Sequence, residues 1–254
     1  MVTPWAGVAC NGAGSVASLS LVCNWQQLGG AIDPAIGQLT ALQTLDLTYC
    51  WVQGTLPTQI GLLTALTSLT LQYSSISGML PSEVGLLTAL TSLTLQYSLI
   101  SGTLPSEMGQ LTAIQVVDLS ANLISGSIPD VFAGLSSLTR LSLWQNSLSG
   151  TLPPSLGSLP SLGELDVYNN PGLSGFVLPN VNMPYWWSGT QLEITKASDV
   201  AALQALKAQW CACDCFLSPT HSLTCEPSYE FRTDTQFMPN ACDSCSSRPP
   251  AAAI

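Results

Sequence analysis

The residues with the greatest capacity for chemistry gather near the end of this 254-residue sequence. Six cysteines share that region with the single histidine, His221; they are Cys211, Cys213, Cys215, Cys225, Cys242 and Cys245. Such a set can form disulfides with many connectivities, or bind zinc with His221 as an extra ligand. The Cys-x-Cys-x-Cys spacing is poor for a standard zinc knuckle, so disulfides are the preferred interpretation and zinc is the alternative.

Carboxylates are the second set with chemical potential. Asp118, Glu164 and Asp166 recur at related positions of a repeating pattern, and a glycosidase needs only a pair of such groups. The pattern predicts an open sheet, however, and not a cleft that excludes water. There is also no G-x-S-x-G elbow and no phosphate-binding loop. We therefore expect no enzyme activity, no metal site and no cofactor.

The element that positions these carboxylates is an internal repeat of 24 residues. Each unit opens with the pattern L-x-x-L-x-L, at Leu42, Leu66, Leu90, Ile114, Leu138 and Leu162. Glycine recurs at Gly54, Gly78, Gly102, Gly126, Gly150 and Gly175, and proline recurs at Pro57, Pro81, Pro105, Pro129, Pro153 and Pro179. A degenerate unit begins at Val16, which gives about seven units over residues 16–179.

This periodicity predicts a right-handed α/β solenoid. Alternating leucines of a short strand point inward, and stacked units bury them in a parallel concave sheet. Glycine and proline then turn the chain across an irregular or 3-10 convex side. A further column holds Asn122, Asn146 and Asn170 in the later units and Cys50, Ser74 and Ser98 in the earlier ones. We expect the amides and hydroxyls of this column to bond the backbone of neighbouring coils.

Unit 114–137, with S-A-N-L-I-S-G-S-I-P, resembles the plant-type extracellular leucine-rich repeat, and Trp5 to Cys10 (W-A-G-V-A-C) resembles the N-terminal cap of that family. The resemblance implies a receptor-like kinase or receptor-like protein ectodomain, or a relative of polygalacturonase inhibitors. It implies an extracellular or cell-surface location and a ligand on the concave sheet. The cap's usual helix and partner cysteine are absent and no signal peptide is visible, so a trimmed chain or an incomplete gene product is expected. Its parent is either a membrane-anchored receptor or a free secreted protein. No apolar run reaches the roughly 20 residues of a membrane span.

Outward strand positions of the repeat supply the candidate binding surface. One part is uncharged and carries a tyrosine ladder, and the other is more charged and aromatic. The candidates are Tyr49, Tyr73, Tyr97, Gln72, Gln96, Asp118, Arg140, Trp144, Glu164, Asp166 and Tyr168. Tyrosine and tryptophan are enriched at interface hot spots. Two structural alternatives stand beside this interpretation: the tyrosines pack only on one another, and Arg140 only pairs with Glu164.

The composition of the chain limits the classes of partner that it can bind. The net charge is −10 and only 8% of residues are charged, so nucleic acid and anionic membranes, which need a basic face, are not expected. The leading hypothesis is recognition of a protein, a peptide or a cell-wall polysaccharide in signalling or defence. A structural spacer of the cell surface or matrix is the main alternative. Ice binding is a third, suggested by the paired Thr70/Thr94 and Gln72/Gln96.

The ends of the chain complete the domain prediction. Residues 1–15 form a partial cap, residues 180–245 a C-terminal capping region with a helix over 198–210, and residues 246–254 a disordered end. The segment 185–187 (Tyr-Trp-Trp) is expected to cover the open core, and a second module beginning near Ser198 is an alternative. Cys10 and Cys23 are candidates to pair with each other, and Cys50 is expected to be a buried thiol.

Overall fold

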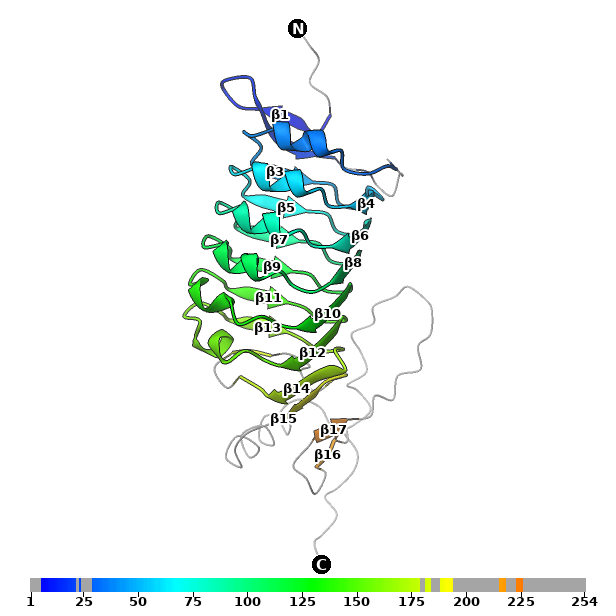
Figure 1. Cartoon of the computed structure of the whole chain (residues 1–254), viewed down its shortest axis with the longest axis vertical. Helices are drawn as coiled ribbons and strands as arrows, with labels where there is room; N and C mark the ends of the chain where they lie inside the picture. The colour runs from blue at the N-terminus through cyan, green and yellow to red at the C-terminus, as the bar shows by residue number, and fades with distance from the viewer. Residues whose placement is uncertain are drawn as a thin grey trace, which may run out of the picture. The chain divides into compact units, whose positions relative to one another are not determined.

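The structure is a computed structural model that describes residues 6–21, 23, 29–178, 181–183 and 188–193, together with the backbone of 215–217 and 223–225. The chain divides into two compact units, residues 1–192 and 193–254. The first unit holds the repeat array, which stacks coil upon coil (Figure 1). Each unit is described by itself.

The predicted concave sheet is present. Its strands run in the order β1-β2-β3-β5-β7-β9-β11-β13, and all pairs are parallel except β1 with β2. The bounds are Val8–Cys10 (β1), Val16–Ser20 (β2), Thr44–Asp46 (β3), Ser68–Thr70 (β5), Ser92–Thr94 (β7), Val116–Asp118 (β9), Arg140–Ser142 (β11) and Glu164–Asp166 (β13). Because Leu45 pairs with Leu69 and Leu69 with Leu93, every inward leucine lies beneath its repeat equivalent.

A second parallel sheet lines another side of the coils, and the sequence did not predict it. Its order is β15-β14-β12-β10-β8-β6-β4, and Figure 1 shows these strands stacked along one edge of the array. The bounds are Gln53–Thr55 (β4), Ser75–Met79 (β6), Leu99–Gly102 (β8), Leu123–Ser127 (β10), Ser147–Thr151 (β12), Gly172–Phe176 (β14) and Gln191–Glu193 (β15). The expectation of a convex side that is only irregular or 3-10 is therefore incomplete.

The glycines of these strands are the reason that the sequence indicates turns at these positions. Gly78, Gly102 and Gly126 lie inside strands or at a strand end with φ between 75° and 78°, a conformation that glycine adopts without strain. The residue two positions before each of them is a buried isoleucine: Ile76, Ile100 and Ile124. One buried side chain and one glycine per strand give too short an alternation to be recognised as strand.

Short 3-10 helices form the rest of the back of each coil, as predicted. They are η1 (Pro34–Gln38), η2 (Thr58–Leu62), η3 (Ser82–Leu86), η4 (Ser106–Gln110), η5 (Phe132–Gly134) and η6 (Pro154–Ser158). A Cβ placed on Gly85 would lie 2.4 Å from the carbonyl oxygen of Glu107 in the next coil. Glycine thus lets adjacent coils approach closely at this point.

The core is the continuous stack of inward side chains. Leu45, Leu69, Leu93, Leu141 and Leu165 are completely buried. Burial of a leucine side chain contributes about 1.5–3 kcal/mol relative to its exposure, and each coil supplies several such residues. No single coil could bury them alone, so the array is stabilised by stacking between neighbours.

The second unit is described only in part. Strands β16 (Cys215–Leu217) and β17 (Leu223–Cys225) pair antiparallel, with Cys215 opposite Cys225. The predicted helix over 198–210, the capping segment 185–187 and the expected disordered end 246–254 lie outside the described residues.

Candidate ligand-binding site on the concave face

The register of the concave sheet aligns the outward residues as the repeat predicts. Thr44, Ser68, Ser92, Val116, Arg140 and Glu164 form one row across the strands; Asp46, Thr70, Thr94, Asp118, Ser142 and Asp166 form the next. The four coils over residues 42–137 contribute mainly hydroxyls to these rows, and the next two contribute mainly charge. The face therefore changes character along the array.

Five aromatic rings form a continuous series beside these rows, which we call the aromatic strip: Tyr49, Tyr73, Tyr97, Trp144 and Tyr168. The ring centroids of Tyr49 and Tyr73 are 4.6 Å apart and those of Tyr73 and Tyr97 are 4.5 Å apart, with the rings stacked. Trp144 stacks on Tyr168 at 5.3 Å with an interplanar angle of 2°. Each ring thus has one face stacked on a neighbouring ring, and Tyr73 has both faces stacked.

The two stacks of the strip meet where the coil of residues 114–137 has a small residue. Ala121 occupies the position that holds Tyr49, Tyr73 and Tyr97 in earlier coils. The ring of Trp144, one coil further on, approaches Tyr97 edge-on at 5.7 Å. Because a methyl side chain lies between them in sequence order, the indole can reach across this coil and keep the strip continuous.

The tyrosines of the strip adopt an uncommon backbone conformation. Tyr49, Tyr73 and Tyr97 have φ between 52° and 59°, as do Ala121, Gln145 and Asn169 at the same position. The left-handed region costs a residue with a Cβ roughly 1–2 kcal/mol. Every coil needs this conformation to leave the concave strand, so the strain belongs to the repeat and not to the tyrosines in particular. Burial raises the pKa of the Tyr73 hydroxyl, and the neighbouring Tyr97 and Tyr49 raise it further.

Arg140, Glu164 and Asp166 form a charged cluster beside Trp144 and Tyr168. Arg140 Nε lies 3.4 Å from Glu164 Oε2, and Arg140 Nη2 donates to Asp166 Oδ2 at 3.3 Å. Burial disfavours the charge on Arg140, but its bond to Asp166 and the attraction of Glu164 outweigh burial and raise the pKa of the guanidinium. Arg140 is the single Lys or Arg among the described residues. Its positive charge is compensated by the carboxylates of Glu164 and Asp166. The predicted ion pair between Arg140 and Glu164 is confirmed, and Arg140 forms a second ion pair with Asp166.

Asp118 and Asp166 differ from the other predicted contact residues because they are buried. The side chain of Asp166 is only 6% exposed, and burial raises its pKa, with Glu164 adding to the rise and Arg140 opposing it. Asp118 accepts hydrogen bonds from the backbone N–H and the hydroxyl of Ser120. These two carboxylates therefore bond neighbouring side chains beneath the surface of the face. The candidates that reach the surface are Arg140, Glu164, Trp144, Tyr168 and the half-buried Gln72 and Gln96.

The cysteines correct one prediction. Cys23 is bonded to Cys50, with Cα atoms 4.9 Å apart, and Cys10 is free and exposed. A Cys10–Cys23 pair and a Cys50 thiol are therefore both wrong. The sequence held a usable signal, since Asn24 lies in the asparagine column of the first coil when its two extra residues are counted, which places Cys23 next to Cys50. Of the tail cysteines, only the backbones of Cys215 and Cys225 are described, and their disulfide bonding stays a prediction.

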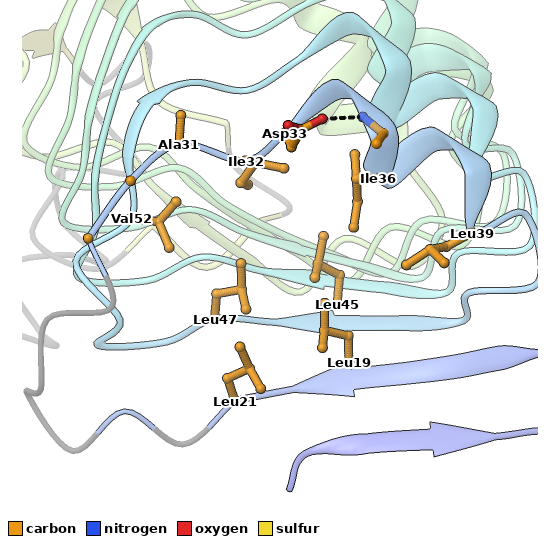
Figure 2. Close-up of a pocket in the computed structure, with 13 residues that line it drawn as sticks. Leu19, Leu21, Ala31, Ile32, Asp33, Ile36, Leu39, Leu45, Leu47 and Val52 are labelled. Carbon is orange, nitrogen blue, oxygen red and sulfur yellow. Dashed lines mark hydrogen bonds between the residues drawn. The ribbon is translucent and has the colours of Figure 1, made fainter. Parts of the chain in front are cut away.

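An apolar cavity of about 370 Å³ lies at the N-terminal end of the array, away from the concave candidates. Figure 2 shows its walls, which include Leu19, Leu21, Leu45, Leu47 and Val52 from the inward columns of the first coils. Asp33 is the one charged residue lining it, and its carboxylate accepts from the N–H of Ala35 at the start of η1. No set of polar groups converges there, so the cavity does not offer an oriented polar site.

The described residues hold no cluster of three or more histidine, cysteine or acidic side chains placed to bind a metal. In the same part of the chain, no helix is long and apolar enough to cross a membrane.

Comparison with known proteins identifies the array. Residues 112–171 match the family model described as leucine rich repeat. The array is a leucine-rich-repeat solenoid. Its coils from Leu42 onward share the same columns, burial and register as the matched segment.

Several solved structures are similar to this array. A plant ice-binding protein matches with 28% identity and a TM-score of 0.65, over 74% of this chain and 62% of that one. The TDR receptor matches with 30% identity and a TM-score of 0.59, over 66% of this chain and 33% of that one. The Arabidopsis receptor kinase HAESA, solved with the peptide hormone IDA and the co-receptor SERK1, matches with 32% identity and a TM-score of 0.58, over 66% and 27% respectively. The solenoid thus spans about a third or less of the two receptor chains, and its repeats are of their plant type.

Proposed function

We propose that this solenoid is an extracellular recognition module that binds a peptide or an extended protein segment at the Trp144–Tyr168 end of its concave face. The single observation that carries the proposal is the meeting of the aromatic strip with the charged cluster at that end. Rigid rings beside hydrogen-bonding groups are the usual composition of an interaction hot spot. The likeness to HAESA, whose structure includes a bound peptide hormone, supports the same ligand class, and arrays of this kind typically bind and do not catalyse.

Ring geometry favours a peptide over a polysaccharide. Sugars commonly stack on an open aromatic face, but both faces of Tyr73 are covered by Tyr49 and Tyr97, and Trp144 and Tyr168 each cover one face of the other. Stacking within the strip thus reduces the ring area open to a sugar, while ring edges and hydroxyls suit peptide side chains and backbone amides. Polysaccharide binding is accordingly the less supported form of the proposal.

Charge specifies the ligand further. Glu164 is exposed on this face, while the one cation of the described residues, Arg140, is already paired with two carboxylates. A ligand carboxylate would have to compete for Arg140, whereas a lysine, arginine or amino terminus of the ligand would add to the attraction of Glu164. We therefore expect peptides with a basic group to be preferred.

The test is selection of binders from a displayed random-peptide library on the full chain, followed by calorimetry with the selected peptide. Trp144→Ala combined with Tyr168→Ala should weaken binding by at least about 30-fold, since one hot-spot residue contributes roughly 2 kcal/mol or more and the contributions of neighbouring hot spots do not simply add. Phe176→Ala is the matched control, because Phe176 is an exposed aromatic on β14 of the second sheet. Unchanged affinity in the double variant, with circular dichroism showing a folded array, would refute the site.

A second candidate function is adsorption to ice. The observation that favours it is the likeness to a plant ice-binding protein, which extends over more of both chains than the likenesses to the TDR receptor and HAESA do. Its test is thermal hysteresis and inhibition of ice recrystallisation by the full chain at micromolar concentration. Absence of both activities would remove this candidate and leave peptide recognition untouched.

A further inference from the structure

We propose that, if the solenoid adsorbs to ice, the adsorbing face is the second sheet, β4 to β14, and not the concave sheet. This inference rests on the second candidate function above. The occupant is one plane of an ice crystal, a rigid and uncharged lattice of water. Such a surface calls for a face that is uncharged and periodic.

The first difference between the two sheets is the number of charged residues on them. Strands β4, β6, β8, β10, β12 and β14 contain no Asp, Glu, Lys, Arg or His. The outward rows of the concave sheet instead carry Asp46, Asp118, Arg140, Glu164 and Asp166. An ion holds liquid water in an orientation set by its own field, and ice cannot accommodate that orientation without cost. The second sheet imposes no such requirement.

Periodicity is the second argument. One outward row, which we call the serine row, is made of Ser77, Ser101, Ser125, Ser149 and Ser174. Several of these hydroxyls donate to a glycine carbonyl of the preceding coil: Ser77 to Gly54 at 3.3 Å, Ser125 to Gly102 at 3.2 Å and Ser174 to Gly150 at 3.4 Å. The hydroxyl proton is then used within the sheet, and the oxygen keeps lone pairs that accept from water.

Regular spacing matters because each contact is weak. Exchanging liquid water for lattice water at one hydroxyl gains little free energy, so adsorption needs many oxygens that meet the lattice together. The register offsets each serine by two residues from its repeat equivalent, since Ser77 pairs with Leu99, Ser125 with Ser147 and Ser149 with Gly172. The serine row therefore crosses neighbouring strands, which lie about 4.7–4.9 Å apart, on one constant diagonal. The serine row therefore offers a line of acceptors with one fixed repeat.

Close packing of methyl groups is the third argument. A Cβ on Gly78 would lie 2.9 Å from Thr55 Cγ2, and a Cβ on Gly126 would lie 2.9 Å from Thr103 Cγ2. Each threonine methyl thus covers the glycine of the next coil, as Thr151 does for Gly175 at 3.0 Å. Methyl groups therefore lie beside the line of hydroxyls, and neither kind of group carries charge. Its most regular stretch is Thr103, Ser127 and Thr151, since Met79 and Phe176 occupy this row in the flanking coils.

The concave sheet lacks these properties, although the sequence suggested it for ice. Thr94 of the proposed Thr70/Thr94 pair is only 9% exposed. The exposed Tyr97 and the partly exposed Arg140 and Glu164 lie on the same face. The second sheet also exposes large side chains, namely Met79, Leu99, Leu123 and Phe176, but all of these are uncharged, whereas Arg140 and Glu164 bring charge to the concave face.

The experiment compares three full-length proteins by thermal hysteresis and ice recrystallisation inhibition. Ser127→Arg with Thr151→Arg puts two charged side chains on the most regular stretch of the second sheet. The matched control, Ser68→Arg with Ser92→Arg, puts the same two side chains on the concave sheet. Thermal melting of each protein shows that the array is folded.

We expect the unsubstituted protein and the concave control to slow ice growth and the second-sheet variant to lose this activity. Activity that persists in the second-sheet variant, or that is lost only in the concave control, overturns the assignment of the face while ice binding stands. No activity in the unsubstituted protein overturns ice binding itself. The failure of the face and the failure of the function are therefore distinct results.

Discussion

The two sheets of the array are built by the same chain, one strand of each per coil, yet their surfaces differ. The concave sheet changes from coil to coil, from hydroxyls around Thr70 to the charged cluster around Arg140. The second sheet repeats nearly the same serine row and glycine row in every coil. A face that varies can discriminate between ligands of irregular shape, whereas a face that repeats can match only another periodic object. The difference shows that one solenoid can present two kinds of recognition chemistry.

The asparagine column joins the two sheets. The Asn146 amide nitrogen donates to the carbonyls of Leu119 and Leu143 at the ends of concave strands, and its oxygen accepts from the N–H of Ile124 in β10. Asn122 and Asn170 make equivalent bonds. In the earlier coils Ser98 bonds Ser74 at 2.9 Å and reaches Leu71 only at 3.4 Å. The later coils are therefore tied between sheets more firmly than the earlier ones.

The largest effect should come from cutting this connection. Asn146→Ala should lower the free energy of unfolding by about 3 kcal/mol, because several buried hydrogen bonds are lost and an N–H is left unpaired. Ser98→Ala, at the equivalent position, should lower it by about 1 kcal/mol, since it removes fewer and longer bonds. Urea unfolding of both variants measures the difference. Equal losses would show that the two halves of the array are tied alike.

A smaller effect should follow from filling the glycine row of the second sheet. Gly126→Ala should destabilise the protein by roughly 2 kcal/mol, because φ is 76° there and the new Cβ would lie 2.9 Å from Thr103 Cγ2. Gly134→Ala is the control, since Gly134 has no positive φ and nothing lies within 4 Å of its added Cβ. Thermal melting compares the two. A Gly126→Ala protein as stable as Gly134→Ala would mean that the second sheet does not need its glycine row.

The smallest effect concerns pH and belongs to the concave sheet. The pKa of Asp166 is raised in the folded protein, with burial as the main cause. The folded state then binds this proton more readily than the unfolded state, so ionisation of Asp166 costs stability. As the pH falls from neutral through the raised pKa towards the ordinary aspartate value, the wild type should gain stability relative to Asp166→Asn.

Denaturant unfolding of the wild type and Asp166→Asn across that pH range gives the sign. A wild type that loses stability relative to Asp166→Asn on acidification would show that Arg140 dominates and that the pKa is depressed. A substitution on the second sheet, such as Ser149→Ala, should shift stability by an amount independent of pH, because that sheet has no titratable group in β4 to β14.

The periodicity of the sequence was sufficient to predict the concave sheet. Leucines such as Leu69 and Leu93 recur at one spacing, and only a stacked parallel sheet buries them all. The columns of outward residues follow from the same spacing. The second sheet could not be predicted, because Ile76 and Gly78 do not give an alternation long enough to separate a strand from a turn.

The details of the site could not be predicted from the sequence for another reason, which is that they depend on the orientation of side chains. Position in the repeat placed Tyr73 and Trp144 on one face, but it did not show that their ring faces are covered. Outward strand positions predicted Asp166 as exposed, whereas its contact with Arg140 and its burial follow from neighbouring side chains. The Cys23–Cys50 bond was missed because two extra residues shift the register of the first coil.

The most direct test of recognition on the varied face is hydrogen exchange of the full chain with and without a peptide selected on it. Binding at the aromatic strip and charged cluster should slow exchange in residues 140–146 and 164–170 and leave β10 and β12 unchanged. Protection confined to the second sheet, or none in those two concave segments at saturating peptide, would contradict the central claim that the concave face is the recognition surface.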